Sequence, residues 1–352
     1  MKMKDIKTAI SRRQFIKKSS IVAGGTTTGL SYFAGCSNKV NSPESVSDEK
    51  DRLNDGFGNG DVYYSGASGM PQRILGNTGM SVSLLSFGGG SKFMTCDEEP
   101  ALQILDNAVK AGVNYFDTSW DYGNGQSEVR FGKVLNNYRD QVYVATKLDA
   151  RQGDAVKIQF EGCLERLQMD YVDVLLMHGI CVDDVLATIE SGVYSDLVKY
   201  KEQGAAKFIG FSVMQEADLF VAKSLIENLD IDVILGIINP VGRYGNCSYL
   251  LPLVNERGIG FLAMKVLRDI VSNKVTAKEL ISYALDKNGV SSAVIGHESM
   301  QELDENIKIV TEYDTSTGIA HNWRPLEDKV ELYTRNHTPV WAQPWYKDGM
   351  IV

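Results

Sequence analysis

The feature that most constrains the fold is an alternation of short β-branched runs with amphipathic helical segments, repeated eight times after residue 82. Most of these runs are continuously apolar, which is typical of parallel strands that are buried on both faces. Strict alternation over eight units predicts an α/β protein with a closed (β/α)8 TIM barrel. The expected strands are Ser83–Phe87, Val113–Thr118, Val142–Thr146, Val172–Met177, Phe208–Ser212, Val233–Ile238, Gly260–Met264 and Ala293–Ile295.

Helical patterns separate these strands. Pro100 stands where the first turn of a helix tolerates proline, and Gly112 stands where a glycine commonly ends a helix. A doubly wound open sheet is the alternative fold, but it needs a glycine-rich fingerprint directly after the first strand. Phe87–Ser91 reads Phe-Gly-Gly-Gly-Ser and matches that fingerprint poorly, so the barrel is preferred. The expected helices include Pro100–Ala111, Gln126–Asn136, Ala155–Gln168 and Met300–Glu312.

The chain divides into four expected segments. A hairpin over Arg73–Val82, with its turn at Gly76–Gly79, precedes the barrel strands. After about residue 314 the alternation lapses into a tail that either packs on the outside of the barrel, which we favour, or folds over its mouth. The aromatic residues of this tail include Trp323, Trp341, Trp345 and Tyr346. The segments are an export signal (1–36), a flexible tether (37–69), the barrel with its N-terminal β-hairpin (70–313) and a C-terminal extension (314–352).

The first 36 residues combine a basic head, a short apolar run and small residues, which are the parts of an export signal. Arg12 and Arg13 before Phe15-Ile16-Lys17 resemble a twin-arginine signal, whose pathway moves folded proteins. Phe33-Ala34-Gly35-Cys36 resembles a lipoprotein cleavage box, and an ordinary cleavage site near Ala34 is the alternative. The polar residues 37–69 cannot bury enough surface to fold. We therefore expect a periplasmic protein or a lipoprotein anchored to the membrane only through Cys36.

Charge and cysteine spacing exclude two classes of function. Residues 1–35 carry a net charge of +6, which leaves −15 for the rest of a chain whose net charge is −9. So acidic a body repels phosphodiesters, and no nucleic-acid partner is expected. The five cysteines stand singly, without a CxxC pair or Cys/His spacing, so no metal site is expected.

Four polar residues fall at the carboxyl ends of neighbouring expected strands, where β/α barrels place their chemistry. Asp117 ends the second strand and Tyr122 follows it. Lys147 ends the third strand and His178 the fourth. A phenol can protonate a carbonyl oxygen whose carbon receives a hydride, and an adjacent ammonium would lower the pKa of the phenol toward neutrality. The carboxylate would hold the lysine, and the imidazole would orient the substrate oxygen or share the proton.

This pattern resembles the aldo-keto reductase superfamily. The resemblance rests on Asn114–Gly123, Ala145–Lys147 and Leu175–His178, and it extends to Arg73–Gly79, Gly204–Ser212 and Gly296–Asn306. It implies an NAD(P)-dependent oxidoreductase that interconverts a carbonyl (an aldehyde, ketone or keto-sugar) and an alcohol by hydride transfer. By the same resemblance Tyr122 is the general acid/base, Lys147 and Asp117 tune it, and His178 places the carbonyl.

The resemblance also implies a nicotinamide nucleotide bound across the same rim. Gly89 and Gly90 would border the nicotinamide ribose, and Ser212 would bond the carboxamide. The residues around the adenosine half would be Gly296, His297, Glu302, Glu305 and Asn306. Three positions depart from the family pattern, namely Val213 for an asparagine, Leu235 for a carboxamide-binding glutamine, and Met264 for a stacking aromatic ring. The polarizable thioether of Met264 can still pack on the nicotinamide ring.

The segment Gly296–Glu302 favours NAD over NADP as the cofactor. It offers the carboxylates of Glu298 and Glu302 and no Arg or Lys. Recognition of a 2′-phosphate needs such a cation, whereas a carboxylate can accept a hydrogen bond from the ribose 2′-hydroxyl. Lys308 or a loop lysine is the alternative partner for a phosphate. Free dinucleotide should be scarce outside the cytoplasm, so we expect the cofactor to be loaded before export and bound tightly.

Two classes of function remain open. The first is an oxidoreductase for a small-molecule carbonyl, alcohol or sugar, including an enzyme that recycles its cofactor on one sugar. The second is a nucleotide-binding sensor or partner-docking protein on the same fold with little turnover. Trp120 and Tyr244 serve either in stacking on a sugar ring or in packing. The four strand-end residues favour the enzyme, because a binding protein has no need of a lysine–tyrosine pair.

Overall fold

The computed structural model describes residues 63–65, 69–181, 183–214, 218–242, 246–313, 321–343 and 345–349. The chain separates into two units, Met1–Phe57 and Gly58–Val352, and all the described residues belong to the second. The expected export signal, Cys36, most of the expected tether and Tyr244 lie outside the described residues. Within the described part of the chain, no helix combines the length and the apolar character needed to cross a membrane.

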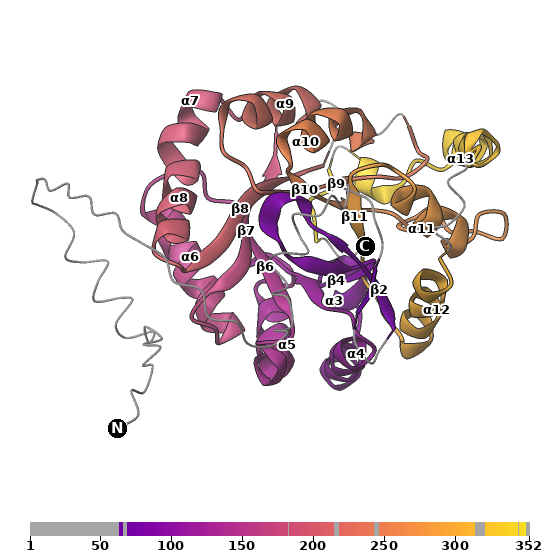
Figure 1. Ribbon diagram of the computed structural model, residues 1–352, viewed down its shortest axis with the longest axis horizontal. Coiled ribbons are helices and arrows are strands. Elements are labelled where there is room, and N and C mark those ends of the chain that lie inside the picture. The colour runs from indigo at the N-terminus through magenta and orange to yellow at the C-terminus, as the bar shows by residue number, and fades with distance from the viewer. Residues whose placement is uncertain are drawn as a thin grey trace, which may run out of the picture. The chain divides into compact units, whose positions relative to one another are not determined.

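Eight parallel strands close into the predicted barrel, ringed by helices (Figure 1). Each strand pairs with its neighbours in chain order, and β11 closes on β4 with Ala293 opposite Leu85. The strands are mostly buried because the barrel interior covers one face and the helices cover the other. The strands are β4 (Leu85–Gly88), β5 (Tyr115–Asp117), β6 (Tyr143–Leu148), β7 (Val172–Ile180), β8 (Ala206–Val213), β9 (Val233–Ile237), β10 (Gly260–Met264) and β11 (Val290–Ile295).

Amphipathic helices connect the strands. The first long helix, α4, has Glu98 and Glu99 in its first turn, where they suit the positive end of the helix dipole. Gly112, with a φ of 94°, follows its end, as the sequence predicts. The helices are α3 (Ser91–Met94), α4 (Glu98–Lys110), α5 (Gln126–Leu135), α6 (Asp154–Leu167), α7 (Leu186–Ile189), α8 (Ser195–Glu202), α9 (Leu219–Asn228), α10 (Leu251–Arg257), α11 (Ala277–Leu285), α12 (Met300–Thr311) and α13 (Arg324–Asn336).

The N-terminal hairpin closes the amino end of the barrel. Its strands, β2 (Met70–Ile74) and β3 (Ser81–Ser83), pair antiparallel. Gly76 in the turn meets the first residue of β10 so closely that a Cβ there would lie 2.3 Å from the amide nitrogen of Gly260. Arg73 of β2 donates hydrogen bonds to two carbonyls at this end of the barrel. The hairpin thus covers the end of the barrel opposite to the one where chemistry is expected.

A further strand, β1 (Tyr63–Ser65), adds to the edge of β2 in antiparallel register. It lies inside residues 37–69, the segment expected to be a tether. The first barrel strand starts at Leu85, two residues later than the sequence predicts, because Ser83 is the last residue of β3.

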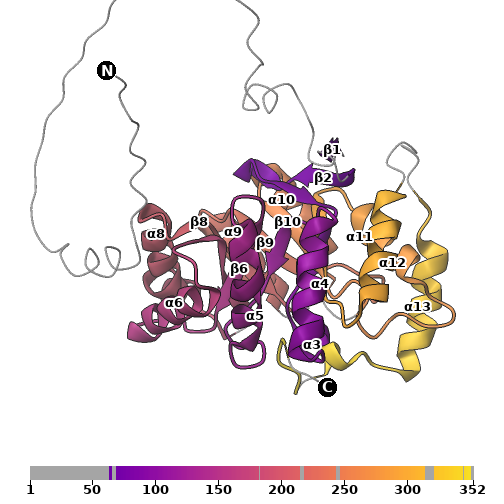
Figure 2. The same ribbon diagram turned by 90° about the horizontal axis from the view of Figure 1, so that it is seen from below.

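The tail divides into two parts with different places. Helix α13 packs on the outside of the barrel, where Lys329 contacts Glu279 at 2.8 Å and Glu327 accepts a hydrogen bond from Tyr283 at 3.2 Å. Residues 345–349 instead reach the mouth, where Asp348 lines the groove described below. Figure 2 shows the yellow tail beside α3, at the end of the barrel opposite β2. The favoured expectation of plain outer packing therefore describes α13 but not the end of the tail.

Candidate active site

The structure brings Asp117, Tyr122, Lys147 and His178 together at the carboxyl end of the barrel. Asp117 is the last residue of β5, while Lys147 and His178 lie inside β6 and β7, which run further than predicted. Tyr122 lies in the loop after β5 and is 4% exposed. Because β5, β6 and β7 are neighbours in the barrel, their carboxyl ends present these side chains at one place on the rim.

Lys147 connects this group. Its ammonium contacts Asp117 Oδ2 at 2.6 Å, the Thr118 carbonyl oxygen at 2.8 Å and the Tyr122 Oη at 3.1 Å. The side chain is fully buried. An ammonium has three protons to donate, so these three acceptors satisfy it and fix its position. Burial raises the pKa of Asp117, although the charge of Lys147 opposes that rise.

The phenol of Tyr122 differs from the expectation that Lys147 would lower its pKa. Burial raises this pKa well above the ordinary value of 10.0, and the carboxylates of Asp348, Asp117 and Asp121 act in the same direction. The nearby ammonium does not outweigh them. In this structure the phenol therefore keeps its proton at neutral pH, which is the form that a proton donor requires.

Three carboxylates surround the imidazole of His178. Its Nδ1 lies 3.1 Å from Asp149 Oδ1 and 3.5 Å from Asp121 Oδ1, and its Nε2 lies 3.1 Å from Asp348 Oδ2. Burial lowers the pKa of His178, but the hydrogen bonds with Asp149 and Asp348 outweigh burial and raise the pKa to about 9. The ring is thus charged at neutral pH and donates from both nitrogens.

Asp348 is a site residue that sequence reasoning missed. Its Oδ2 accepts a hydrogen bond from Tyr122 Oη at 2.7 Å, and its Oδ1 pairs with the ammonium of Lys265. Burial would raise the pKa of Asp348, but Lys265 and His178 outweigh burial and hold the pKa well below its ordinary value. The C-terminal tail therefore places an ionised carboxylate directly on the predicted proton donor.

A groove of about 580 Å³ leads from this group across the carboxyl ends of β4, β10 and β11. Tyr122, Asp348 and Gly349 lie among its lining residues, as do the loop residues after β10. Six of the predicted cofactor-binding residues line it, namely Gly90, Met264, Gly296, Glu302, Glu305 and Asn306. Leu235, one of the departures from the family pattern, lines it as well.

Gly89, Ser212 and His297 were also expected at the cofactor, and the structure places none of them among the lining residues of the groove. A Cβ on Gly89 would lie 2.4 Å from Ser127 Oγ, so this glycine serves close packing with α5. The hydroxyl oxygen of Ser212 is buried and accepts a hydrogen bond from the amide of Gly179 at 2.8 Å.

His297 points into the core instead of the groove. Its ring lies 5.3 Å from that of Phe87, and neither ring nitrogen has a hydrogen-bond partner among the described residues. Burial, with the charge of Lys92, lowers its pKa to about 3. The side chain of a residue that follows a strand can point inward or outward. Here the imidazole of His297 points inward and packs beside Phe87 of β4.

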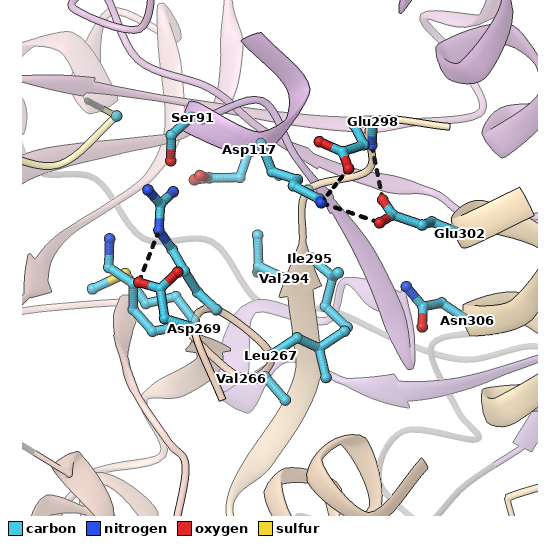
Figure 3. Close-up of a pocket in the computed structure, with 18 of the residues that line it drawn as sticks. Ser91, Asp117, Val266, Leu267, Asp269, Val294, Ile295, Glu298, Glu302 and Asn306 are labelled. Atoms are coloured by element: carbon cyan, nitrogen blue, oxygen red, sulfur yellow. Dashed lines mark hydrogen bonds and ion pairs between the residues drawn. The ribbon is translucent and has the colours of Figure 1, made fainter. Parts of the chain in front are cut away.

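The far end of the groove carries an ion-pair cluster (Figure 3). Lys92 of α3 contacts Glu298 at 2.5 Å and Glu302 at 3.1 Å. Burial lowers the pKa of Lys92, but these two carboxylates raise it by more. The segment Gly296–Glu302 contains no cation of its own, yet the fold brings one to it from a distant part of the chain. Because Lys92 is about 200 residues away in sequence, the local pattern at Gly296–Glu302 does not reveal this cation.

The chemistry of the groove fits a dinucleotide. Lys92, Lys265 and Arg268 supply cations that can attract a diphosphate. The carboxylates at the far end of the groove can accept hydrogen bonds from ribose hydroxyls. A side chain on Gly90 would fill the space in front of the Tyr122 ring, since its Cβ would lie 3.5 Å from that ring. A flat ring could lie there, next to the proton donor.

Comparisons with known proteins show what this chain is similar to. A model of the aldo/keto reductase family matches residues 84–279. L-galactose dehydrogenase of Arabidopsis thaliana is 30% identical over an alignment of 285 positions, which covers 69% of this chain and 89% of that protein. The uncharacterized oxidoreductase YqkF of Bacillus subtilis is 25% identical over 76% of this chain and 97% of its own. The holo form of the aldo-keto reductase AKR11C1 from Bacillus halodurans superposes with a TM-score of 0.62 at 22% identity, over 74% of this chain and 96% of that one.

Proposed function

The chain belongs to the aldo/keto reductase family, and from that premise we propose that it interconverts a carbonyl and an alcohol with Tyr122 as the proton donor and acceptor. The chain is an oxidoreductase of the aldo-keto reductase type, and this family binds NAD(P)H.

One observation carries the catalytic proposal. Tyr122 Oη and His178 Nε2 converge on a single oxygen, Asp348 Oδ2, at 2.7 and 3.1 Å. A carbonyl oxygen in that position would accept the same two hydrogen bonds. Two donors on one oxygen polarise a carbonyl and stabilise the alkoxide that forms as its carbon is reduced.

Each residue of the group has a separate task in this proposal. A bound reduced nicotinamide would supply the hydride. Tyr122 gives its proton to the substrate oxygen in reduction and takes one from the alcohol in oxidation. Lys147 holds the phenol in place and stabilises the phenolate left behind, and Asp117 fixes Lys147. His178 holds the substrate oxygen from the other side.

We further propose a polyhydroxylated, sugar-like substrate. Beyond His178 the rim carries Asp121 and Asp149, and Trp120 donates a hydrogen bond to Asp149. Carboxylates accept hydrogen bonds from hydroxyls and repel anionic substrates. An indole beside them offers a face on which a sugar ring can stack. The name of the Arabidopsis relative, L-galactose dehydrogenase, supports the same class.

A panel assay tests the activity. The protein is mixed with NADH or NADPH and a series of aldehydes, ketones and keto-sugars, and in the reverse direction with oxidised nucleotide and sugars. We expect the nicotinamide absorbance to change only when nucleotide and substrate are both present, with neutral sugars ahead of sugar acids. Tight nucleotide binding without turnover on any member of the panel would support the sensor hypothesis instead.

For the nucleotide we propose NAD over NADP, bound tightly enough to survive export. Glu298, Glu302 and Glu305 place negative charge at the end of the groove where a 2′-phosphate would be repelled. Lys92 opposes this preference, but both neighbouring carboxylates already pair with it. Protein purified without added nucleotide is denatured and the released molecules are identified. Release of NADP, or an empty protein that prefers NADP, would contradict the proposal.

We also propose export by the twin-arginine route, on the motif at Arg12 and Arg13. Replacement of both by lysine should hold the protein in the cytoplasm, and Cys36→Ala should release it from membranes. Cell fractionation followed by immunoblotting measures both. Normal export of the double-lysine variant would exclude this route.

A further inference from the structure

The last described residues of the chain form a strap, defined here as residues 340–343 and 345–349. The strap follows α13 and runs along the loop after β10. The amide of Val340 donates to Asp269 Oδ2 at 3.1 Å, and Trp341 Nε1 donates to the Arg268 carbonyl oxygen at 2.9 Å. Trp341 is almost fully buried. These contacts fix the strap before it reaches the catalytic group.

Tyr346 then fixes the strap beside Lys265. The ammonium of Lys265 donates to Tyr346 Oη at 3.1 Å and lies 4.7 Å from the centre of the Tyr346 ring. The guanidinium of Arg268 lies 5.5 Å from the same ring. Two cations thus hold one aromatic side chain, an arrangement that is favourable for each cation when it is desolvated.

The strap ends against Tyr122. Gly349 has a φ of 77°, and a Cβ there would lie 2.1 Å from Cδ1 of the Tyr122 ring. A larger residue would collide with the ring, so the backbone of Gly349 occupies the space beside the phenol. Asp348, the residue before it, delivers its carboxylate to Tyr122 Oη, His178 Nε2 and Lys265 Nζ.

Strap and substrate compete for the same donors. The phenol of Tyr122 has one proton, and it points at Asp348 Oδ2 here. The same carboxylate oxygen takes the hydrogen bond from His178 Nε2. A substrate oxygen that binds these two groups must displace the carboxylate, because two oxygens cannot occupy one position.

We infer that Tyr122, His178 and Lys265 form a carboxylate site that the chain fills with its own Asp348, so that the strap inhibits the enzyme until substrate displaces it. The inference rests on the proposed function for its kinetic consequences, but the carboxylate site can be tested without turnover. Because the occupant is tethered, it competes at every protein concentration. The external ligand that fits the emptied site is a small carboxylate.

The kinetic test compares Asp348→Ala with Lys347→Ala in the full-length protein. Lys347 is the exposed neighbour of Asp348 and serves as the matched control. If the strap is closed about nine-tenths of the time, its release lowers the apparent KM about tenfold and leaves kcat unchanged. Lys347→Ala should stay within about twofold of the wild type. A raised KM in Asp348→Ala would show that the carboxylate helps to bind substrate, and it would overturn the inference.

A second variant guards against a local effect of the alanine. A chain that ends at Lys347 lacks both Asp348 and Gly349, and it should show the same fall in KM. If the truncated protein instead keeps the wild-type KM, the strap does not compete with substrate. Circular dichroism and the denaturation midpoint confirm that each variant is folded.

Acetate provides the readout that does not need turnover. Calorimetry should show acetate binding to Asp348→Ala at least about tenfold more tightly than to the wild type, since the site is then vacated. Hydrogen exchange of residues 340–349 should become faster in Asp348→Ala and stay slow in Lys347→Ala. Equal acetate affinity in all three proteins would contradict the carboxylate site. Tighter acetate binding to Asp348→Ala together with no turnover on the panel would contradict the proposed function but would still support the carboxylate site.

Discussion

The rim formed by β5, β6 and β7 and the C-terminal strap meet at Tyr122, but the protein holds them in different ways. Asp117, Lys147 and His178 of the rim sit on barrel strands, and Lys147 is fully buried with three partners. Asp348 belongs to a segment that is held by Trp341, Tyr346 and a few hydrogen bonds to the loop after β10. The rim can therefore move only if the barrel opens, whereas the strap can leave while the barrel stays folded.

The difference separates two properties of the site, the fixed geometry of the rim residues and the detachable contact made by the strap. In the proposed function the rim is preorganised for proton transfer, because burial and hydrogen bonds fix the side chain of Lys147. The strap places Asp348 Oδ2 at the position where the substrate oxygen is proposed to bind. Local opening of a weakly attached segment costs less free energy than global unfolding, so strap release can accompany each turnover.

The largest effect is expected from Lys147→Met on the rim. The substitution leaves Asp117 as a buried charge without its partner, which costs about 3–5 kcal/mol of stability. Urea denaturation measures the loss. Because Lys147 also stabilises the phenolate, any residual activity should show its acid limb at higher pH.

Lys157→Met is the matched control for that prediction. Lys157 lies on α6 with its side chain 56% exposed, and its loss should change stability by less than about 0.5 kcal/mol. Equal losses in the two variants would mean that the rim pair is no more important than a surface pair, and an unchanged pH profile would remove the tuning role of Lys147.

A smaller and more local effect is expected from Trp341→Ala on the strap. Removal of this buried indole should speed hydrogen exchange of residues 345–349 by at least about tenfold while the midpoint of global unfolding shifts little. Trp345→Ala is the control, since Trp345 is 54% exposed. If Trp341→Ala instead destabilises the whole barrel as Lys147→Met does, the strap and the rim form one cooperative unit and the comparison fails.

The smallest effect is expected from pH. Burial lowers the pKa of His178, but Asp149 and Asp348 raise it to about 9, so the charged contact with Asp348 stabilises the closed strap while the ring is protonated and is lost as pH rises through about 9. The pKa of Asp348 is lowered, so its contribution is lost only in acid, below 3.8. The pKa of Lys265 is raised above 10.5, which keeps it charged through this window. The other titratable groups around these three are Asp117, Asp121, Tyr122, Lys147, Asp149 and Tyr346.

Hydrogen exchange of the strap, corrected for the intrinsic pH dependence of exchange, should therefore accelerate with a midpoint near pH 9. Asp348→Ala should lack this midpoint. A strap that is equally protected at pH 8 and pH 10 would show that the imidazolium does not hold it.

Sequence reasoning succeeded where the relevant residues are neighbours along the chain or along the barrel. The apolar runs predict the barrel because each run is a continuous stretch of the chain. The order of three successive strands then predicts that Asp117, Tyr122, Lys147 and His178 lie together. Barrel topology converts order in the sequence into adjacency on the rim.

The same reasoning missed contacts between distant segments. Asp348 lies 226 residues from Tyr122, and no spacing rule links the two. Lys92 is likewise far from Glu298 in sequence. His297 was assigned to the groove because it follows β11, but the direction of one side chain depends on the packing around Phe87, which a pattern does not reveal. The aromatic residues of the tail were the one available signal of a segment that packs.

The most direct test of the account is the rate of a single turnover in Tyr122→Phe. Wild-type and variant proteins are saturated with reduced nucleotide and mixed with a carbonyl substrate from the panel, and the nicotinamide absorbance is followed in a stopped-flow instrument. Loss of the general acid should slow hydride transfer by about 10²–10⁴-fold, while the affinity for nucleotide stays within a few-fold. A variant that reduces the substrate at the wild-type rate would contradict the central claim that Tyr122 donates the proton.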